Sequence, residues 1–159
     1  VHRAALIAAR VLHAGLTVAI QTIIVLGLGL ALGSGLPGGA MGFVAILVPA
    51  VLIAIGFSGL SNAVALLTRR EETLIAVINF FGMPLTFLSA SFMSRDLMPG
   101  WMQTLSMGNP VDWAVSAARE AMLGRDWTLV WSQSALLAVF AVAACAAATL
   151  AFRGYRRVG

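Results

Sequence analysis

Residues 11–68 read VLHAGLTVAIQTIIVLGLGLALGSGLPGGAMGFVAILVPAVLIAIGFSGLSNAVALLT, and this stretch contains no charged side chain. A charged group at the centre of a bilayer costs several kcal/mol, so segments that lie there exclude charge. A single membrane-spanning helix needs about 20 predominantly apolar residues. The stretch is therefore too long for one span and long enough for two. It is interrupted by GSGLPGG at residues 33–39, a run of turn-forming residues, so we expect two antiparallel helices joined there.

Two further uncharged runs follow, Thr73–Ser94 and Trp127–Phe152. The chain is 60% hydrophobic and 10% charged, whereas a soluble domain has about 25% charged residues. We therefore predict an all-α, polytopic helical membrane protein, with residues 1–159 forming a single membrane domain. The four predicted spans are roughly Val11–Leu32, Met41–Leu67, Thr73–Phe92 and Leu129–Phe152.

Composition excludes several classes of function. The chain has no lysine and no Gly-x-x-x-x-Gly-Lys-Ser/Thr sequence, so no nucleotide-binding P-loop is expected. Its one cysteine, Cys145, lies in an apolar run, and His2 and His13 are isolated, so neither a disulfide nor a metal-ligand cluster is expected. We therefore predict no catalytic residue, no metal site and no cofactor bound by this chain. The net charge of +4 follows from where the arginines lie, and no nucleic-acid partner is predicted.

The arginines are unevenly distributed between the two sides of the predicted bundle. Short cytoplasmic loops of membrane proteins are rich in arginine and lysine, while tryptophan favours the membrane–water boundary. This rule predicts that both termini are cytoplasmic, in the inner or plasma membrane. The inner side would then hold Arg3, Arg10, Arg69, Arg70, Arg153, Arg156 and Arg157, and the outer side Arg95, Arg119, Arg125 and all four tryptophans, Trp101, Trp113, Trp127 and Trp131.

Polar and small residues inside the predicted spans are candidates for a substrate pathway or for helix packing. Interhelical hydrogen bonds in membranes are weak enough that either role fits these residues. Small residues also recur at helical spacing, at Gly29 and Gly33 and again at Ala141, Cys145 and Thr149; this pattern fits a packing face or a general enrichment in alanine. The polar candidates are Gln21, Ser58, Ser61, Asn62 and Asn79, together with Pro84, which would loosen its helix or simply kink it.

The segment from Ser89 to Trp127 is too apolar for an open loop and too broken for a span. Its second half predicts a short amphipathic helix, with Asn109 as the N-cap, Pro110 in the first position and Gly124 just after the end. We place one set of side chains on its apolar face (Val111, Ala114, Val115, Ala118 and Met122) and another on its polar face (Asp112, Ser116, Arg119 and Glu120).

The first half of this segment, around Leu97–Leu105, predicts another short helix that is opened by Pro99. Together the two helices form an outer helical hairpin over about residues 95–124. The hairpin either packs on its own bundle, as a re-entrant element near an exit path, or lies on the outer surface as an interfacial anchor.

The order of several short motifs resembles one known family. These motifs are Pro84-Leu-Thr-Phe-Leu-Ser-Ala-Ser-Phe, Met98-Pro-Gly-Trp-Met with its Trp101, Asn109-Pro110, and Ala118-Arg119-Glu120, together with the opening Val1-His-Arg-Ala-Ala-Leu-Ile-Ala-Ala-Arg-Val-Leu. The pattern is similar to that of ABC type-2 exporter permeases, in particular the drug-resistance branch typified by daunorubicin-resistance permeases. Such permeases have six spans, cytoplasmic termini and a re-entrant outer hairpin before the last span. The resemblance therefore implies that this chain corresponds to the C-terminal portion, with the first two spans missing.

The resemblance also implies a function and partners. The chain would be the permease subunit of an ATP-driven exporter, forming half of the pathway for a drug-like, lipid or other amphipathic substrate. A second permease copy and an ABC ATPase subunit, which holds ATP and Mg²⁺, would complete the exporter within the membrane lipids. The candidate ATPase-coupling residues are Arg3, Arg10, Arg69, Arg70, Glu71 and Glu72, which fit a lipid anchor equally well. The alternative function is a small non-transporting membrane scaffold or assembly protein.

Overall fold

The computed structural model describes residues 3–68, 71–89 and 97–155, and in this part of the chain all regular secondary structure is helical. The fold class predicted from the sequence, all-α, is confirmed. The helices are α1 (Arg3–Ala31), α2 (Gly39–Thr68), α3 (Glu71–Phe87), α4 (Gly100–Ser106), α5 (Pro110–Leu123) and α6 (Trp127–Tyr155).

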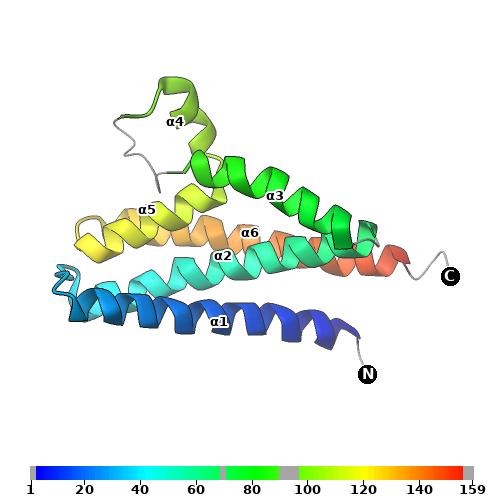
Figure 1. Ribbon diagram of the computed structural model, residues 1–159, viewed down its shortest axis with the longest axis horizontal. Helices are drawn as coiled ribbons and strands as arrows, with labels where there is room; N and C mark the ends of the chain where they lie inside the picture. Colours follow the sequence, from blue (N-terminus) through cyan, green and yellow to red (C-terminus); the bar gives the residue numbers. More distant parts are fainter. Residues whose placement is uncertain (1–2, 69–70, 90–96, 156–159) are drawn as a thin grey trace.

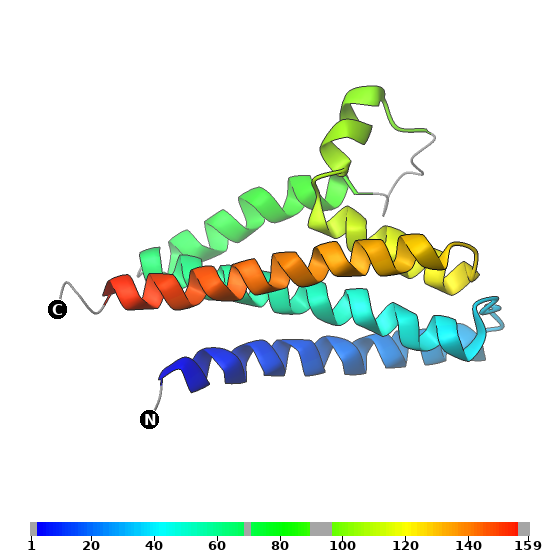
Figure 2. The same ribbon diagram turned by 180° about the vertical axis from the view of Figure 1, so that it is seen from behind.

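Three long helices, α1, α2 and α6, lie side by side as the body of the molecule (Figures 1 and 2). Among the described residues, these three are long and apolar enough to cross a membrane, over Ala8–Ala31, Gly39–Leu66 and Trp127–Ala151. The first, second and last predicted spans thus coincide with three candidate membrane-spanning helices, with ends that differ by a few residues. Helix α1 runs antiparallel to both α2 and α6, so the start of α1 and the end of α6 lie at the same end of the bundle (Figure 1).

The third predicted span, 73–92, is not confirmed as a span. Helix α3 ends at Phe87, and its apolar part, Ile75–Phe87, is shorter than the other three. The helix ends in a tight turn in which Ser89 N–H donates to the Thr86 carbonyl at 3.2 Å rather than to the carbonyl four residues back. Residues 90–92 lie outside the described part of the chain. Helix α3 diverges from the body and leads toward α4, which stands apart from the bundle (Figure 1).

Helix α6 contacts α2 along a seam that repeats every three or four residues. This spacing is the one that keeps one face of a helix on a neighbouring helix in left-handed packing. Of the two interpretations of Ala141, Cys145 and Thr149, a shared packing face does not hold, because Cys145 is only half-buried and Thr149 is exposed. The buried seam consists of Val130, Ser134, Leu137, Ala141, Ala144 and Ala148.

Glycines allow α2 to approach both α6 and α5 at backbone distance. A Cβ on Gly59 would lie 3.0 Å from the backbone of Ala144 and Cys145 on α6. A Cβ on Gly38 or on Gly42 would overlap the carbonyl oxygen of Ala121 on α5. The predicted packing role of Gly29 and Gly33 has no such contact: Gly29 faces only Ser34, and Gly33, with φ of 84°, ends α1.

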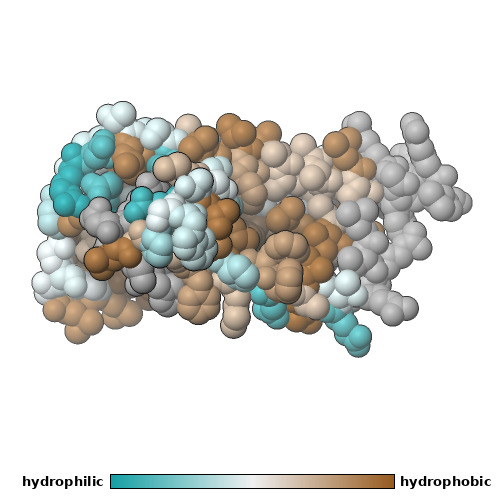
Figure 3. Space-filling model, turned by 90° about the horizontal axis from the view of Figure 1, so that it is seen from above, coloured by the Kyte–Doolittle hydropathy of each residue, from teal (hydrophilic) through white to brown (hydrophobic). Residues whose placement is uncertain are grey.

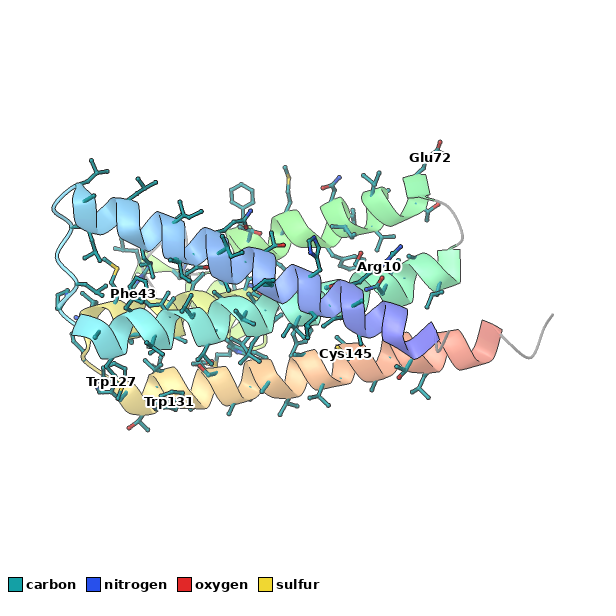
Figure 4. All side chains as sticks on the ribbon, turned by 90° about the horizontal axis from the view of Figure 1, so that it is seen from below. Arg10, Phe43, Glu72, Trp127, Trp131 and Cys145 are labelled. Carbon is teal, nitrogen blue, oxygen red and sulfur yellow. The ribbon has the colours of Figure 1, made fainter. Side chains whose placement is uncertain are left out.

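The two ends of the bundle differ in chemistry. Hydrophilic residues gather at the end that carries the α1–α2 and α5–α6 turns, and hydrophobic residues cover the middle (Figure 3). Trp127 and Trp131 lie at this end, while Arg10 and Glu72 lie toward the opposite end (Figure 4). The fold thus places Trp127 and Trp131 at one end and Arg10 toward the other, as predicted for these residues; Arg69, Arg70, Arg95, Arg156 and Arg157 lie outside the described part of the chain.

Candidate functional site

A groove of about 510 Å³ lies between α2 and α3, where α3 diverges from the body. Helices α2 and α3 supply its walls, and one residue of α5 closes it. The lining residues are Phe57, Leu60, Ser61 and Val64 of α2, Val77, Ile78, Phe81, Gly82, Leu85 and Thr86 of α3, and Val111 of α5.

The described lining of the groove is apolar and uncharged. Its polar side chains are the hydroxyls of Ser61 and Thr86, and the Thr86 hydroxyl already donates to the Gly82 carbonyl at 2.8 Å within its own helix. Two aromatic rings, Phe57 and Phe81, face the groove from opposite walls. A buried charge without a partner is strongly unfavourable, so such a lining suits an uncharged, apolar group and disfavours an ionised one.

The structure places few of the predicted in-span residues at this groove. Ser61 lines it, and Asn62 lies beside it but donates to the Ser58 carbonyl of its own helix at 2.8 Å. Gln21, Asn79 and Pro84 are exposed on the outside of α1 and α3 and are absent from the lining. The aromatic lining was missed from the sequence, because a phenylalanine in an apolar helix carries no signal that distinguishes a groove wall from a lipid-facing side.

The predicted hairpin helices are present, with the expected ends. Pro99 precedes α4, and Asn109 caps α5 by accepting a hydrogen bond from Val111 N–H at 2.9 Å. Pro110 takes the first position of α5, and Gly124 ends it in the left-handed region with φ of 64°. Helix α5 packs on both α2 and α6, which favours the packed alternative over a surface anchor for this helix.

The predicted faces of α5 need one correction. Its packed face is made of Ala114, Ala117 and Ala121, which are small enough for close approach to α2 and α6. Asp112, predicted to face water, is completely buried and is not without a partner. At about 100° per residue, Asp112 lies on the opposite side of α5 from the alanines. The helix is therefore enclosed from two sides at its first turn, which periodicity alone does not reveal.

Asn109 makes a second contact that the sequence did not predict. Its side-chain amide donates to the carbonyl of Leu85, on the last turn of α3, at 2.6 Å. The residue is 4% exposed, so this bond is shielded from water. Asn109 thus connects the end of α3 to the start of α5.

The opposite end of α5 is fastened to the turn that precedes α2. Gly38 N–H donates to the Met122 carbonyl at 2.9 Å. Glu120 forms an ion pair with Arg125 at 3.1 Å, next to the end of the helix. Arg119 and Trp101 are exposed, and Trp113 donates its indole N–H to the Met107 carbonyl at 2.7 Å.

The candidate coupling residues are only partly described. Arg10 on α1 and Glu72 on α3 are exposed and lie toward the same end of the bundle (Figure 4). Arg3 begins α1 and Glu71 begins α3, also at that end. Arg69 and Arg70 lie outside the described residues, so their role stays a prediction.

The sequence is also similar to that of a known protein family. The model of the ABC-2 type transporter family matches residues 1–123. The chain is 31% identical over 129 residues to the daunorubicin resistance ABC transporter permease protein DrrB1 of Streptomyces coeruleorubidus, covering 81% of this chain and 45% of that protein. It is 34% identical over 76 residues to ycf38 of Cyanophora paradoxa, which carries a transport-permease name, covering 48% of this chain and 26% of that protein.

The chain therefore spans less than half the length of these two relatives. No solved structure matches the chain significantly.

Proposed function

We propose that this chain forms half of the substrate pathway of an ATP-driven exporter. The chain belongs to the ABC-2 type transporter family and is a multi-pass membrane protein of the transport-permease type. In this proposal the groove between α2 and α3 is one wall of that pathway. The observation that carries it is the uncharged, largely apolar lining of a groove beside α3, which contacts α2 much less than α1, α5 and α6 do.

The substrate we propose has an apolar body that is large enough to contact both walls of the groove. Phe57 and Phe81 would contact a planar ring through their faces or edges, which aromatic rings favour. The name of the Streptomyces relative refers to daunorubicin resistance, which is compatible with an aromatic, amphipathic substrate. A lipid or another drug-like molecule with an uncharged apolar body fits the same lining.

Energy would come from a partner subunit. The sequence contains no P-loop lysine, so ATP and Mg²⁺ would be bound by an ABC ATPase and not by this chain. We propose that the end of the bundle with Arg3, Arg10, Glu71 and Glu72 faces this ATPase on the cytoplasmic side, together with Arg69 and Arg70. The arginine content of this end supports that orientation.

The opposite end, with Trp127 and Trp131, would then lie at the outer boundary of the inner or plasma membrane (Figure 4). A second permease copy would complete the pathway. Large apolar side chains on the outside of α3 support a lipid or permease neighbour there, since helices that face lipid or another helix stay apolar on that side. They are Ile75, Phe80, Met83 and Phe87.

Transport in membrane vesicles tests this proposal. The permease is co-expressed with a candidate ABC ATPase from the same organism, and inverted vesicles are assayed for ATP-dependent uptake of daunorubicin, whose fluorescence reports its accumulation. The matched control carries an ATPase whose P-loop lysine is replaced by alanine. We expect uptake with the intact ATPase and none with the control.

Failure of the permease to co-purify with any ABC ATPase would contradict the proposal and would favour a membrane scaffold. Uptake that is equal in the control would contradict ATP coupling. Daunorubicin is one member of the proposed class, so uncharged apolar dyes are assayed in parallel.

A further inference from the structure

A buried amide, that of Asn109, contacts the C-terminal end of α3. The carbonyl of Leu85 lies in the last turn of α3, where helix carbonyls have no partner within the helix. Ser89 N–H, which would reach it in a continued helix, bonds the Thr86 carbonyl instead. Asn109 Nδ2 donates to the Leu85 carbonyl at 2.6 Å across 24 residues of sequence.

All four polar groups of Asn109 are engaged. Its side-chain oxygen accepts from Val111 N–H at 2.9 Å, and its side-chain nitrogen donates to Leu85. Its backbone N–H donates to the Ser106 carbonyl at 3.0 Å, and its backbone carbonyl accepts from Trp113 N–H at 3.1 Å. An amide side chain combines one acceptor and two donors, so Asn109 can cap α5 and bind α3 at once.

The two elements that Asn109 joins differ in how firmly they are held. Helix α5 contacts α2 and α6 extensively, and its far end is fixed by the Gly38–Met122 backbone bond. Helix α3 contacts the body much less, and Pro84 inside it removes one backbone hydrogen bond near its end. The Asn109–Leu85 bond therefore joins a loosely packed helix to a firmly packed one.

We propose that Asn109 is a positioning residue that clasps the end of α3 to α5 and thereby sets the width of the groove between α2 and α3. Val111 of α5 lies in the groove lining next to this clasp, and Leu85 of α3 belongs to the same lining. Release of the bond would allow the end of α3 to move relative to α2. The consequence for transport rests on the proposed function; the clasp itself does not.

Replacement by serine separates the two roles of Asn109. Serine is a good N-cap and accepts from the first turn of a helix, but its side chain is too short to donate to Leu85. Alanine removes both the cap and the clasp. Asn62→Ala is the matched control, because Asn62 also donates its amide to a helix carbonyl, at 2.8 Å, but within its own helix.

The measurement is a distance between α3 and the body. Spin labels are attached at Met83 on α3 and Trp131 on α6, which are 68% and 52% exposed, in a Cys145→Ala background. The permease is purified with its partner ATPase, and labelled copies are diluted with unlabelled ones so that each distance is within one copy. We expect Asn109→Ser and Asn109→Ala to shift and broaden the distance distribution alike, and Asn62→Ala to leave it unchanged.

A distribution for Asn109→Ser that equals wild type would overturn the proposal, because capping alone would then explain Asn109. The serine variant keeps the test valid where the alanine variant fails to fold. A shifted distance with unchanged daunorubicin uptake would support the clasp while contradicting the groove as the pathway. The two proposals therefore fail separately.

Discussion

Helix α6 and helix α3 both pack beside α2, and they do so in contrasting ways. Against α6, α2 presents glycines to a seam of alanines, and the two backbones come within direct contact at Gly59 and Ala144. Against α3, α2 presents the larger Phe57, Leu60 and Val64, and a groove of about 510 Å³ remains. Without a strong hydrophobic force in lipid, close packing of small residues is what holds helices together. The contrast indicates a rigid body of α2, α5 and α6 and a separately held α3.

The largest expected effect comes from breaking the rigid body at Gly42. A Cβ there would overlap the Ala121 carbonyl, and a backbone atom has no rotamer by which to move away. Gly42→Ala should therefore destabilise the permease by about 3 kcal/mol or more, at the upper end of overpacking effects. The measurement is thermal unfolding of the purified protein in detergent.

Gly27→Ala is the control for that change, because nothing lies within 4 Å of the position of its Cβ. It should leave stability unchanged or raise it by up to about 1 kcal/mol through helix propensity. Equal destabilisation by both variants would mean that the α2–α5 contact is not the cause.

An intermediate effect on stability is expected from placing a larger side chain in the seam between α6 and α2. Ala144 is 5% exposed and faces Gly59, so Ala144→Leu should destabilise by roughly 1–3 kcal/mol as side chains and backbone shift to admit it. Ala143→Leu, at an exposed neighbour on the same helix, provides the comparison. If the melting temperatures of the two variants agree, the seam does not have the packing described above.

Substitutions in the groove lining should affect transport more than they affect stability, in contrast to substitutions in the rigid body. Phe81 is 58% exposed and lines the groove, whereas Phe80 is 74% exposed and does not. Phe81→Ala should raise the KM for an apolar substrate about tenfold, because contact with a phenylalanine side chain contributes about 1.5–3 kcal/mol. Its melting temperature should stay close to that of wild type.

The Phe80 ring packs edge-on against Phe81, with ring centroids 5.3 Å apart, so the control is Met83, which is 68% exposed and absent from the lining. Met83→Ala should change neither KM nor the melting temperature in the same vesicle and unfolding assays. A KM that rises equally for both variants would remove the groove from the pathway.

The smallest effect is expected at the ion pair of Glu120 and Arg125. The Arg125 side chain is 66% exposed, so water and salt weaken the attraction, and such pairs contribute about 0–1 kcal/mol. Glu120→Gln should lower the stability by less than about 1 kcal/mol in low salt and by less still in high salt. A larger loss would show that α5 is held to the body by charge in addition to its alanine face.

Much of this architecture was predictable from local sequence signals. The uncharged run 11–68 and its glycine-rich interruption predicted α1 and α2, and Asn109, Pro110 and Gly124 predicted both ends of α5. These signals act within a few residues of where they are read, so one sequence is sufficient for them.

Other features depend on which helices pack against each other, and local sequence signals do not determine these tertiary contacts. The Asn109–Leu85 bond joins residues 24 apart, and the burial of Asp112 depends on an element packed against its side of α5. On α6, the residues that are buried after Ala141 are Ala144 and Ala148, and not Cys145 and Thr149. The sequence does not distinguish these two sets, because alanines occur on every side of that helix. Of the polar residues predicted as pathway or packing groups, Ser61 lines the groove, whose walls are otherwise largely apolar and include Phe57 and Phe81.

The close packing of α2, α5 and α6 and the looser packing of α3 lead us to predict that α3 moves against this body during transport. Two spin-label pairs that share Val139 of α6 test it most directly, in the permease–ATPase complex with Cys145 replaced by alanine. One pair adds Phe80 on α3 and the other adds Val44 on α2, all at exposed positions. Between the nucleotide-free and ATP-bound states, the Phe80–Val139 distance should change and the Val44–Val139 distance should not. Equal changes in both pairs, or no change in either, would contradict this account.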